Sequence, residues 1–120
     1  MIANFVVFQL KPGARGAFIE ASLGNSRGSI DGPGCLATSI IADPVREDVA
    51  YVFEVFADQA AFENHHDQAY YKQWIADTSG LMAKDYEMLQ STTFPDDASL
   101  RHLRLAVGGD PEPAAWTAAD

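Results

Sequence analysis

The sequence predicts a single α+β domain with the element order β-α-β-β-α-β and a four-stranded antiparallel sheet. Short apolar segments alternate in the manner of strands, and longer segments between them repeat apolar residues at helical spacing. Clusters of Gly, Pro and Asp separate these segments. Two helices can cover only one face of such a sheet, so both helices are expected on the same face.

The first predicted strand runs from Ile2 to Leu10 and is mostly apolar on both sides. Lys11-Pro12-Gly13 ends it, because proline and glycine interrupt a strand. A helix is expected from Ala14 to Ile30, where Gly24 and Gly28 each cost about 1 kcal/mol relative to alanine. We therefore expect the second half of this helix to be bent or locally irregular.

A turn at Asp31-Gly32-Pro33-Gly34 precedes a second predicted strand from Cys35 to Ala42. The third predicted strand, from Tyr51 to Phe56, is expected to pair with the second as a hairpin. The second helical region should extend from Gln59 to Thr78 and break near Asp67, whose side chain can cap a helix.

The last predicted strand runs from Lys84 to Phe94 and completes the split βαβ, or ferredoxin-like, arrangement. The strands that begin at Ile2 and Tyr51 look apolar on both faces, and the domain has no further element to cover the face without helices. We therefore expect a homodimer in which two sheets pack face to face.

The chain divides in composition near its C-terminal end. Residues 1–96 are expected to form the ferredoxin-like domain, whereas residues 97–120 form a tail that is flexible or packs on the partner protomer. Trp116 is the residue of this tail that is expected to dock on a partner.

The composition argues against several classes of partner. The formal charge of −9 and a pI near 4.5 repel phosphate backbones and anionic lipids, so neither nucleic acid nor a membrane is expected as a partner. With Cys35 as its single cysteine the chain cannot form an intrachain disulfide, which suits the reducing cytoplasm. The N-terminal residues do not resemble a signal peptide, and we expect a cytoplasmic protein.

The richest chemistry follows the third predicted strand. Glu54 lies between apolar residues of that strand, and an ionised carboxylate buried there without partners would cost several kcal/mol. Asp58 is a predicted helix cap, and His65 and His66 follow within the helix. A neutral imidazole can take a proton from an acidic phenol or enediol, so His65 and Glu54 are the candidate catalytic pair, with His66 beside them. The alternatives are a histidine without a role and a structural carboxylate.

Aromatic and amide side chains could form the walls of a small-molecule pocket around this pair. Tyr70, Tyr71 and Trp74 share one side of the second helical region, where a flat aromatic ligand would stack well. Asn25 follows the core-facing stripe of the first helix and could line the same cavity. The alternative for all four residues is an ordinary structural role in the core.

No metal or cofactor is expected. Adjacent helical residues such as His65 and His66 point about 100° apart and cannot easily chelate one ion together. The chain has no His-x-x-x-His motif, no glycine-rich dinucleotide fingerprint and no P-loop.

An ordered set of short motifs resembles the antibiotic biosynthesis monooxygenase family over roughly residues 2 to 95. The motifs are Phe8-x-Leu10-Lys11-Pro12-Gly13, Gly32-Pro33-Gly34-Cys35-Leu36, Asp43-Pro44, Phe53-Glu54-Val55-Phe56-x-Asp58-x-x-Ala61-Phe62-x-x-His65 and Tyr70-Tyr71-Lys72-x-Trp74. The resemblance implies a dimeric α+β barrel, and enzymes of this family commonly oxidise quinols or polyphenols with molecular oxygen, without metal or flavin. His65 matches the family's usual histidine, and Glu54 matches its usual strand glutamate.

These expectations lead to one functional hypothesis and two alternatives. The hypothesis is a cofactor-independent monooxygenase that oxidises a small electron-rich aromatic with oxygen. Because residues 25–30 resemble isomerases that process a phosphorylated quorum-sensing signal, the first alternative is an isomerase of a phosphorylated or enolisable small molecule. The second alternative is a non-catalytic dimer that binds a ligand.

Overall fold

The computed structural model describes residues 1–92 of the chain, and its elements follow the predicted order. The second helical region is split in two, and a short 3-10 turn follows it. The elements are β1 (Ile2–Gln9), α1 (Arg15–Asp31), β2 (Cys35–Ala42), β3 (Val49–Phe56), α2 (Gln59–His65), α3 (Ala69–Thr78), η1 (Ser79–Leu81) and β4 (Glu87–Ser91).

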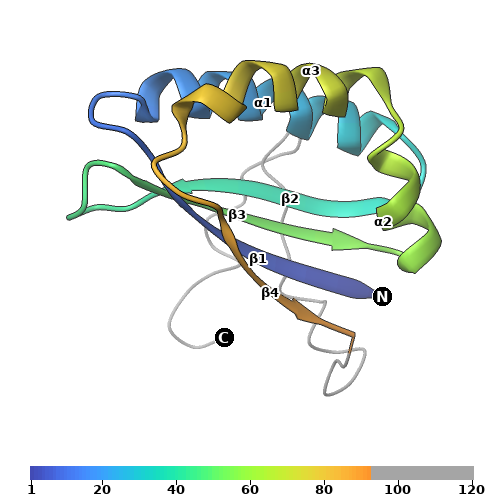
Figure 1. Cartoon of the computed structure of the whole chain (residues 1–120). Coiled ribbons are helices and arrows are strands. Elements are labelled where there is room, and N and C mark those ends of the chain that lie inside the picture. The colour runs from blue at the N-terminus through green and yellow to red at the C-terminus, as the bar shows by residue number, and fades with distance from the viewer. Residues whose placement is uncertain (93–120) are drawn as a thin grey trace, which may run out of the picture.

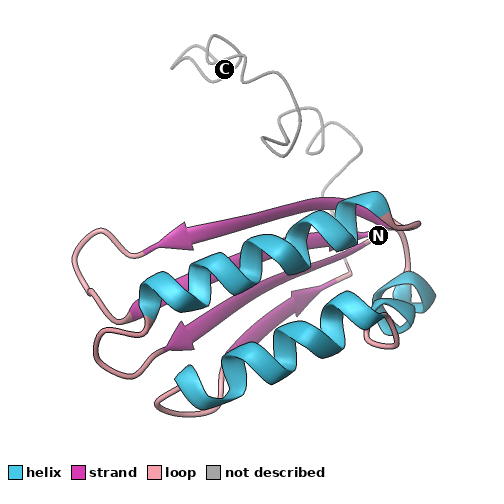
Figure 2. Ribbon diagram, turned by 90° about the horizontal axis from the view of Figure 1, so that it is seen from above, coloured by secondary structure: helices cyan, strands magenta, loops and turns pink. Residues whose placement is uncertain are grey.

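The strands form one antiparallel sheet in the order β2-β3-β1-β4, so β1 and β3 occupy its centre. Helices α1 and α3 lie side by side along one face of this sheet, and α2 lies at one end (Figures 1 and 2). This arrangement confirms the predicted ferredoxin-like α+β fold.

An aromatic cluster joins the helices to the sheet. The ring of Phe8 on β1 lies 4.7 Å from Phe18 of α1 and 5.9 Å from Trp74 of α3, measured between ring centroids. All three side chains are buried, and burying a side chain of this size stabilises a fold by about 1.5–3 kcal/mol. The cluster therefore fixes the distance between the two layers.

Helix α1 is helical without interruption, so the locally irregular second half expected from its glycines is not found. The glycine at position 28 is instead explained by its packing against α3. A Cβ atom at this position would lie 2.3 Å from Cγ of Tyr70, so the missing side chain lets the tyrosine ring of α3 rest directly on α1. Nothing lies within 4 Å of the corresponding position at Gly24.

The break in the second helical region falls where it was predicted. The Asp58 carboxylate accepts a hydrogen bond from the amide of Ala61 (2.8 Å), which confirms it as the cap of α2. Helix α2 ends at His65 and α3 begins after Gln68, which is its N-cap residue. Asp67 lies in the connection and, contrary to expectation, is not the cap.

The end of the molecule opposite α2 is held by polar contacts. The guanidinium of Arg15 donates to the carbonyl oxygens of Asp43 (2.9 Å) and Arg46 (3.0 Å) in the β2–β3 loop, and more distantly to that of Val49. The Asp43 carboxylate accepts from the Arg46 amide, the Tyr51 hydroxyl and the Val45 amide, and these bonds hold its pKa well below the usual range. This network joins the loop to the start of α1.

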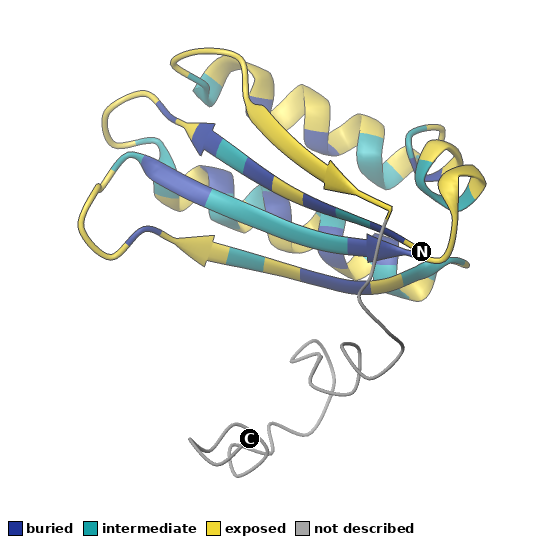
Figure 3. Cartoon of the chain, turned by 90° about the horizontal axis from the view of Figure 1, so that it is seen from below, coloured by how far each residue is buried: buried dark blue, intermediate teal, exposed yellow. Residues whose placement is uncertain are grey.

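The face of the sheet turned away from the helices carries exposed apolar side chains. None of the described helices covers this face (Figures 1 and 3). Phe5, Ile41 and Leu89 lie on it with 38%, 42% and 71% of their surfaces exposed, because their strand neighbours at the alternate positions face the helices. Strand β4 is exposed along its whole length (Figure 3).

Two boundaries differ from the predictions. Strand β4 begins at Glu87 rather than Lys84, because the chain first pairs Leu10 with Met82 and bonds the Ala83 amide to the carbonyl of Gln9. The predicted strand end at Phe94, the boundary at residue 96 and the tail with Trp116 lie outside the described residues. No helix within residues 1–92 is both long and apolar enough to cross a bilayer.

The contact between Gly28 and Tyr70 predicts opposite effects of alanine at two positions of α1. Gly28→Ala should lower the free energy of unfolding by about 1–3 kcal/mol, because the new methyl group overlaps the tyrosine ring. Gly24→Ala should raise it by about 0.4–1 kcal/mol, because the space is open and alanine favours the helix. Urea unfolding followed by circular dichroism measures both changes, and equal effects would contradict the packing described here.

Candidate active site

A cavity of about 290 Å³ lies between the helices and the sheet, next to the aromatic cluster. The apolar part of its sheet side comes from Val6 of β1, Ile40 of β2 and Val52 of β3. Tyr86 and Met88 line its β4 side and remain 47% and 44% exposed. An apolar cavity of this kind, with a few polar groups, is the usual form of a small-molecule site.

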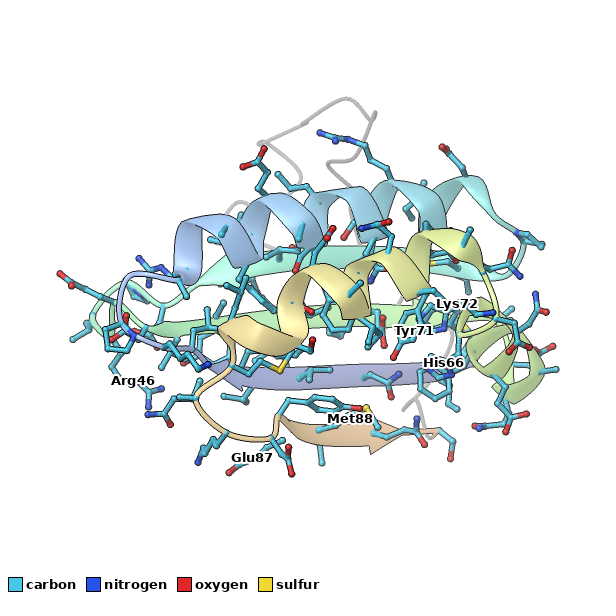
Figure 4. The ribbon with its side chains drawn as sticks, turned by 45° about the horizontal axis from the view of Figure 1, so that its top comes forward. Arg46, His66, Tyr71, Lys72, Glu87 and Met88 are labelled. Atoms are coloured by element: carbon cyan, nitrogen blue, oxygen red, sulfur yellow. The ribbon has the colours of Figure 1, made fainter. Side chains whose placement is uncertain are left out.

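The end of α2 brings both neighbouring histidines to this cavity. The rings of His65 and His66 lie 4.3 Å apart between centroids, and the ring of Tyr71 lies within 5 Å of each. Figure 4 shows His66 beside Tyr71 above the sheet and Met88 on the β4 side. Arg46 lies at the opposite end of the molecule in the same view.

His65 is the buried member of the pair, with 5% of its surface exposed. Its Nδ1 lies 2.5 Å from the carbonyl oxygen of Phe62. A carbonyl oxygen only accepts, so Nδ1 carries the proton and donates it, which leaves the lone pair on Nε2 free. Burial lowers the pKa of His65 below 6.5, more than the bond to Phe62 raises it. His65 is therefore a neutral imidazole near pH 7.

Glu54 of β3 also lines the cavity and is held from the neighbouring strand. Its Oε1 accepts a hydrogen bond from Nδ2 of Asn4 on β1 (3.0 Å). Burial raises the pKa of Glu54 above 4.5, and the bond from Asn4 opposes this rise. Among residues 1–92 no other hydrogen bond to the Glu54 side chain is formed, so Oε2 is open to a ligand.

The predicted aromatic wall is divided by the structure. Tyr71 and Trp74 line the cavity, and Nε1 of Trp74 donates to the hydroxyl of Ser22 on α1 (2.9 Å). Tyr70 is not among the cavity-lining residues, because its ring rests on Gly28. A contact between Tyr70 and a ligand stays a prediction.

Asn25 lines the cavity from α1, as predicted from its place on the helix. Its Oδ1 is buried and has no hydrogen-bond partner among the described residues. A buried acceptor without a partner costs about 1–3 kcal/mol, so Asn25 holds an unsatisfied acceptor beside the cavity. Asn25 and Trp74 also line a more open hollow of about 560 Å³ between α1 and α3.

The sequence model of the antibiotic biosynthesis monooxygenase family matches residues 1–77 of the chain. The chain belongs to this family. None of the curated proteins matches its sequence.

Three solved structures have the same fold, and the first two are of proteins named for the family. One from Nitrosomonas europaea has a TM-score of 0.74 at 21% identity, covering 78% of this chain and 99% of its own. Another, from Caulobacter crescentus CB15, has a TM-score of 0.72 at 21% identity, covering 78% and 89% of the two chains. Rv0793 from Mycobacterium tuberculosis has a TM-score of 0.73 at 16% identity, covering 80% and 97%. At these identities the likeness shows the fold alone.

In this member of the antibiotic biosynthesis monooxygenase family, sequence reasoning missed Asn4. The signal was present, since Asn4 is the polar residue in an apolar series that runs from Ile2 through Val6 to Phe8. Tyr86 and Met88 were assigned to a strand but not to the site. Within residues 1–92 no group of three or more His, Cys, Asp or Glu side chains is placed to hold a metal ion.

The environment of His65 predicts its titration. In nuclear magnetic resonance spectra of the family member, His65 should titrate below pH 6.5, because burial disfavours the imidazolium. Its neutral form should carry the proton on Nδ1, which the 15N shifts of the ring report. An Nε2–H tautomer, or a midpoint above 6.5, would contradict this description.

Proposed function

We propose that the protein is a cofactor-independent monooxygenase that oxidises a small electron-rich phenol or quinol with molecular oxygen. The observation that supports this proposal is the His65 imidazole, neutral and with Nε2 free, in an apolar cavity that also holds Glu54. Such an imidazole is a suitable general base for a phenolic proton near pH 7. Membership of the family supports the same reaction class.

The proposed reaction begins with proton transfer from the phenolic hydroxyl to Nε2 of His65. The phenolate then gives one electron to oxygen, and the phenoxyl radical and superoxide combine at a ring carbon that carries hydrogen. The resulting peroxide takes the proton back from His65. Loss of the ring proton and cleavage of the O–O bond release water and leave a quinone, so one phenol and one O₂ give one quinone and one water.

The other polar groups of the cavity would orient the ring. Glu54 offers Oε2 and Asn25 offers Oδ1 as acceptors, so a ligand with a second hydroxyl group would donate to one of them while its first hydroxyl meets the base. We propose that Tyr71, Trp74 and His66 hold the ring by stacking and edge contacts.

The isomerase alternative is less well supported where it needs a phosphate. No lysine or arginine is among the cavity-lining residues of the described chain, whereas a buried phosphate would need cationic partners. An isomerase acting on a neutral enolisable compound needs no such partner, and turnover without oxygen would identify it. A non-catalytic binding dimer would show binding and no turnover.

We also propose that the protein acts as a homodimer whose open sheet faces pack together. Support comes from the exposed Phe5, Ile41 and Leu89 on the face that no described helix covers. We propose the cytoplasm as its compartment, where its unpaired thiol, Cys35, would stay reduced.

Replacement of the proposed base tests the reaction. With a quinol that the wild type consumes, His65→Ala should lower kcat/KM for oxygen uptake by about 10²–10⁴-fold, the usual contribution of a general base. Asn64→Ala is the matched control, because this exposed neighbour on α2 does not line the cavity and should retain wild-type uptake. Turnover by His65→Ala at the wild-type rate would discard the assignment.

A charge on the open face tests the dimer. Leu89→Glu should produce monomers in sedimentation velocity runs, because the carboxylate would be buried between two sheets. Leu23→Glu adds the same charge to an exposed position of α1 on the helix side and should leave the dimer intact. If Leu89→Glu sediments as a dimer, the sheet-to-sheet arrangement is wrong.

A further inference from the structure

A row of polar side chains crosses the whole sheet beneath the cavity. The register places Thr38 of β2 beside Glu54 of β3, Glu54 beside Asn4 of β1, and Asn4 beside Gln90 of β4. The next row on the same side is entirely apolar and consists of Ile40, Val52, Val6 and Met88. The polar row therefore stands out from its surroundings.

Hydrogen bonds give part of this row a fixed direction. Nε2 of Gln90 donates to Oδ1 of Asn4 (2.8 Å), and Nδ2 of Asn4 donates to Oε1 of Glu54 (3.0 Å). If the Asn4 amide turned over, its NH₂ group would face the NH₂ group of Gln90, and its oxygen would face the Glu54 carboxylate. The donor at Gln90 and the acceptor at Glu54 thus favour the same orientation of the Asn4 amide, which has no exposed surface.

We propose that Asn4, with its orientation supported by Gln90, is a positioning residue that fixes one oxygen of Glu54 and leaves the other oxygen for the ligand. This inference rests on the proposed function in that Glu54 is taken to orient the substrate. It extends the site to an edge strand, because Gln90 itself is exposed and does not line the cavity.

The orientation of Asn4 also determines which charge state of Glu54 is favoured. A donor N–H stabilises the carboxylate, whereas the amide oxygen would favour the protonated acid. Within the described chain, no lysine or arginine is among the titratable groups that face Glu54. They are Cys35, His65, His66, Tyr70, Tyr71 and Tyr86. The bond from Asn4 is thus the direct contact that opposes the effect of burial on the pKa of Glu54.

Gln90→Glu tests the proposal without replacing the buried Asn4. The new side chain has nearly the same size but only accepts, so Asn4 should turn its NH₂ group towards position 90 and its oxygen towards Glu54. Nuclear Overhauser contacts from the Asn4 NH₂ group should then move from Glu54 to residue 90. The 13C carboxyl signal of Glu54, assigned with Glu54→Gln, should titrate higher by about one pH unit.

Gln59→Glu is the control, because it adds the same charge to an exposed position of α2 that does not line the cavity and does not lie on the open face of the sheet. It should leave the Asn4 Overhauser contacts and the titration of the Glu54 carboxyl signal as they are in the wild type. The proposal is overturned if the Asn4 contacts do not move in Gln90→Glu, or if Glu54 titrates no higher there than in Gln59→Glu.

Turnover separates this inference from the proposed function. With Gln90→Glu, the acid limb of kcat/KM should move to higher pH together with the Glu54 signal, because Glu54 would be ionised only at higher pH. A Glu54 signal that moves while the acid limb stays in place supports the positioning role and counts against a role for Glu54 in turnover.

Discussion

The structure depends on the packing of Trp74 between α3, α1 and the sheet. One side of the indole meets Phe8 and Phe18 in the aromatic cluster, while the same side chain also lines the cavity. Its N–H group is bound to Ser22, so the two helices are joined by a hydrogen bond as well as by apolar contact. Trp74 therefore belongs both to the aromatic cluster and to the wall of the cavity.

Two polar groups of that cavity, His65 and Glu54, are each bound once by the protein and left with one unused position. The imidazole of His65 donates from Nδ1, and the carboxylate of Glu54 accepts through Oε1. Partial satisfaction limits the cost of burial, which would be several kcal/mol for a charge without partners. The remaining lone pairs of His65 and Glu54 are acceptors in the lining of the cavity and favour a ligand with hydroxyl groups.

Local sequence signals predicted the elements well where residues next to a boundary determine it. Strand β2 has the predicted bounds because a turn residue lies at each of its ends. Gly34, with its positive φ of 92°, precedes the strand, and Asp43-Pro44 follows it. The start of β4 was misplaced because it depends on pairing between residues 9–10 and 82–83. No local pattern reports such a contact.

The site was predicted by residue type but not by arrangement. Periodicity could not separate Tyr70 from Tyr71, because only the close approach of Gly28 decides which ring leaves the cavity. Asn4 was missed for a similar reason, since its partners Glu54 and Gln90 are 50 and 86 positions away along the chain. Hydrogen bonds between distant strands depend on register, which a single sequence specifies poorly.

The Arg15 network has a consequence for how the sequence can change over evolution. Because one guanidinium holds the loop carbonyls at the end remote from α2, the integrity of the fold is secured away from the histidines. Half-exposed residues at the edge of the cavity, such as Tyr86 and Met88, can then change with less penalty to folding than the buried His65. Such a scaffold can acquire a new ligand preference by substitutions at the edge of the cavity alone.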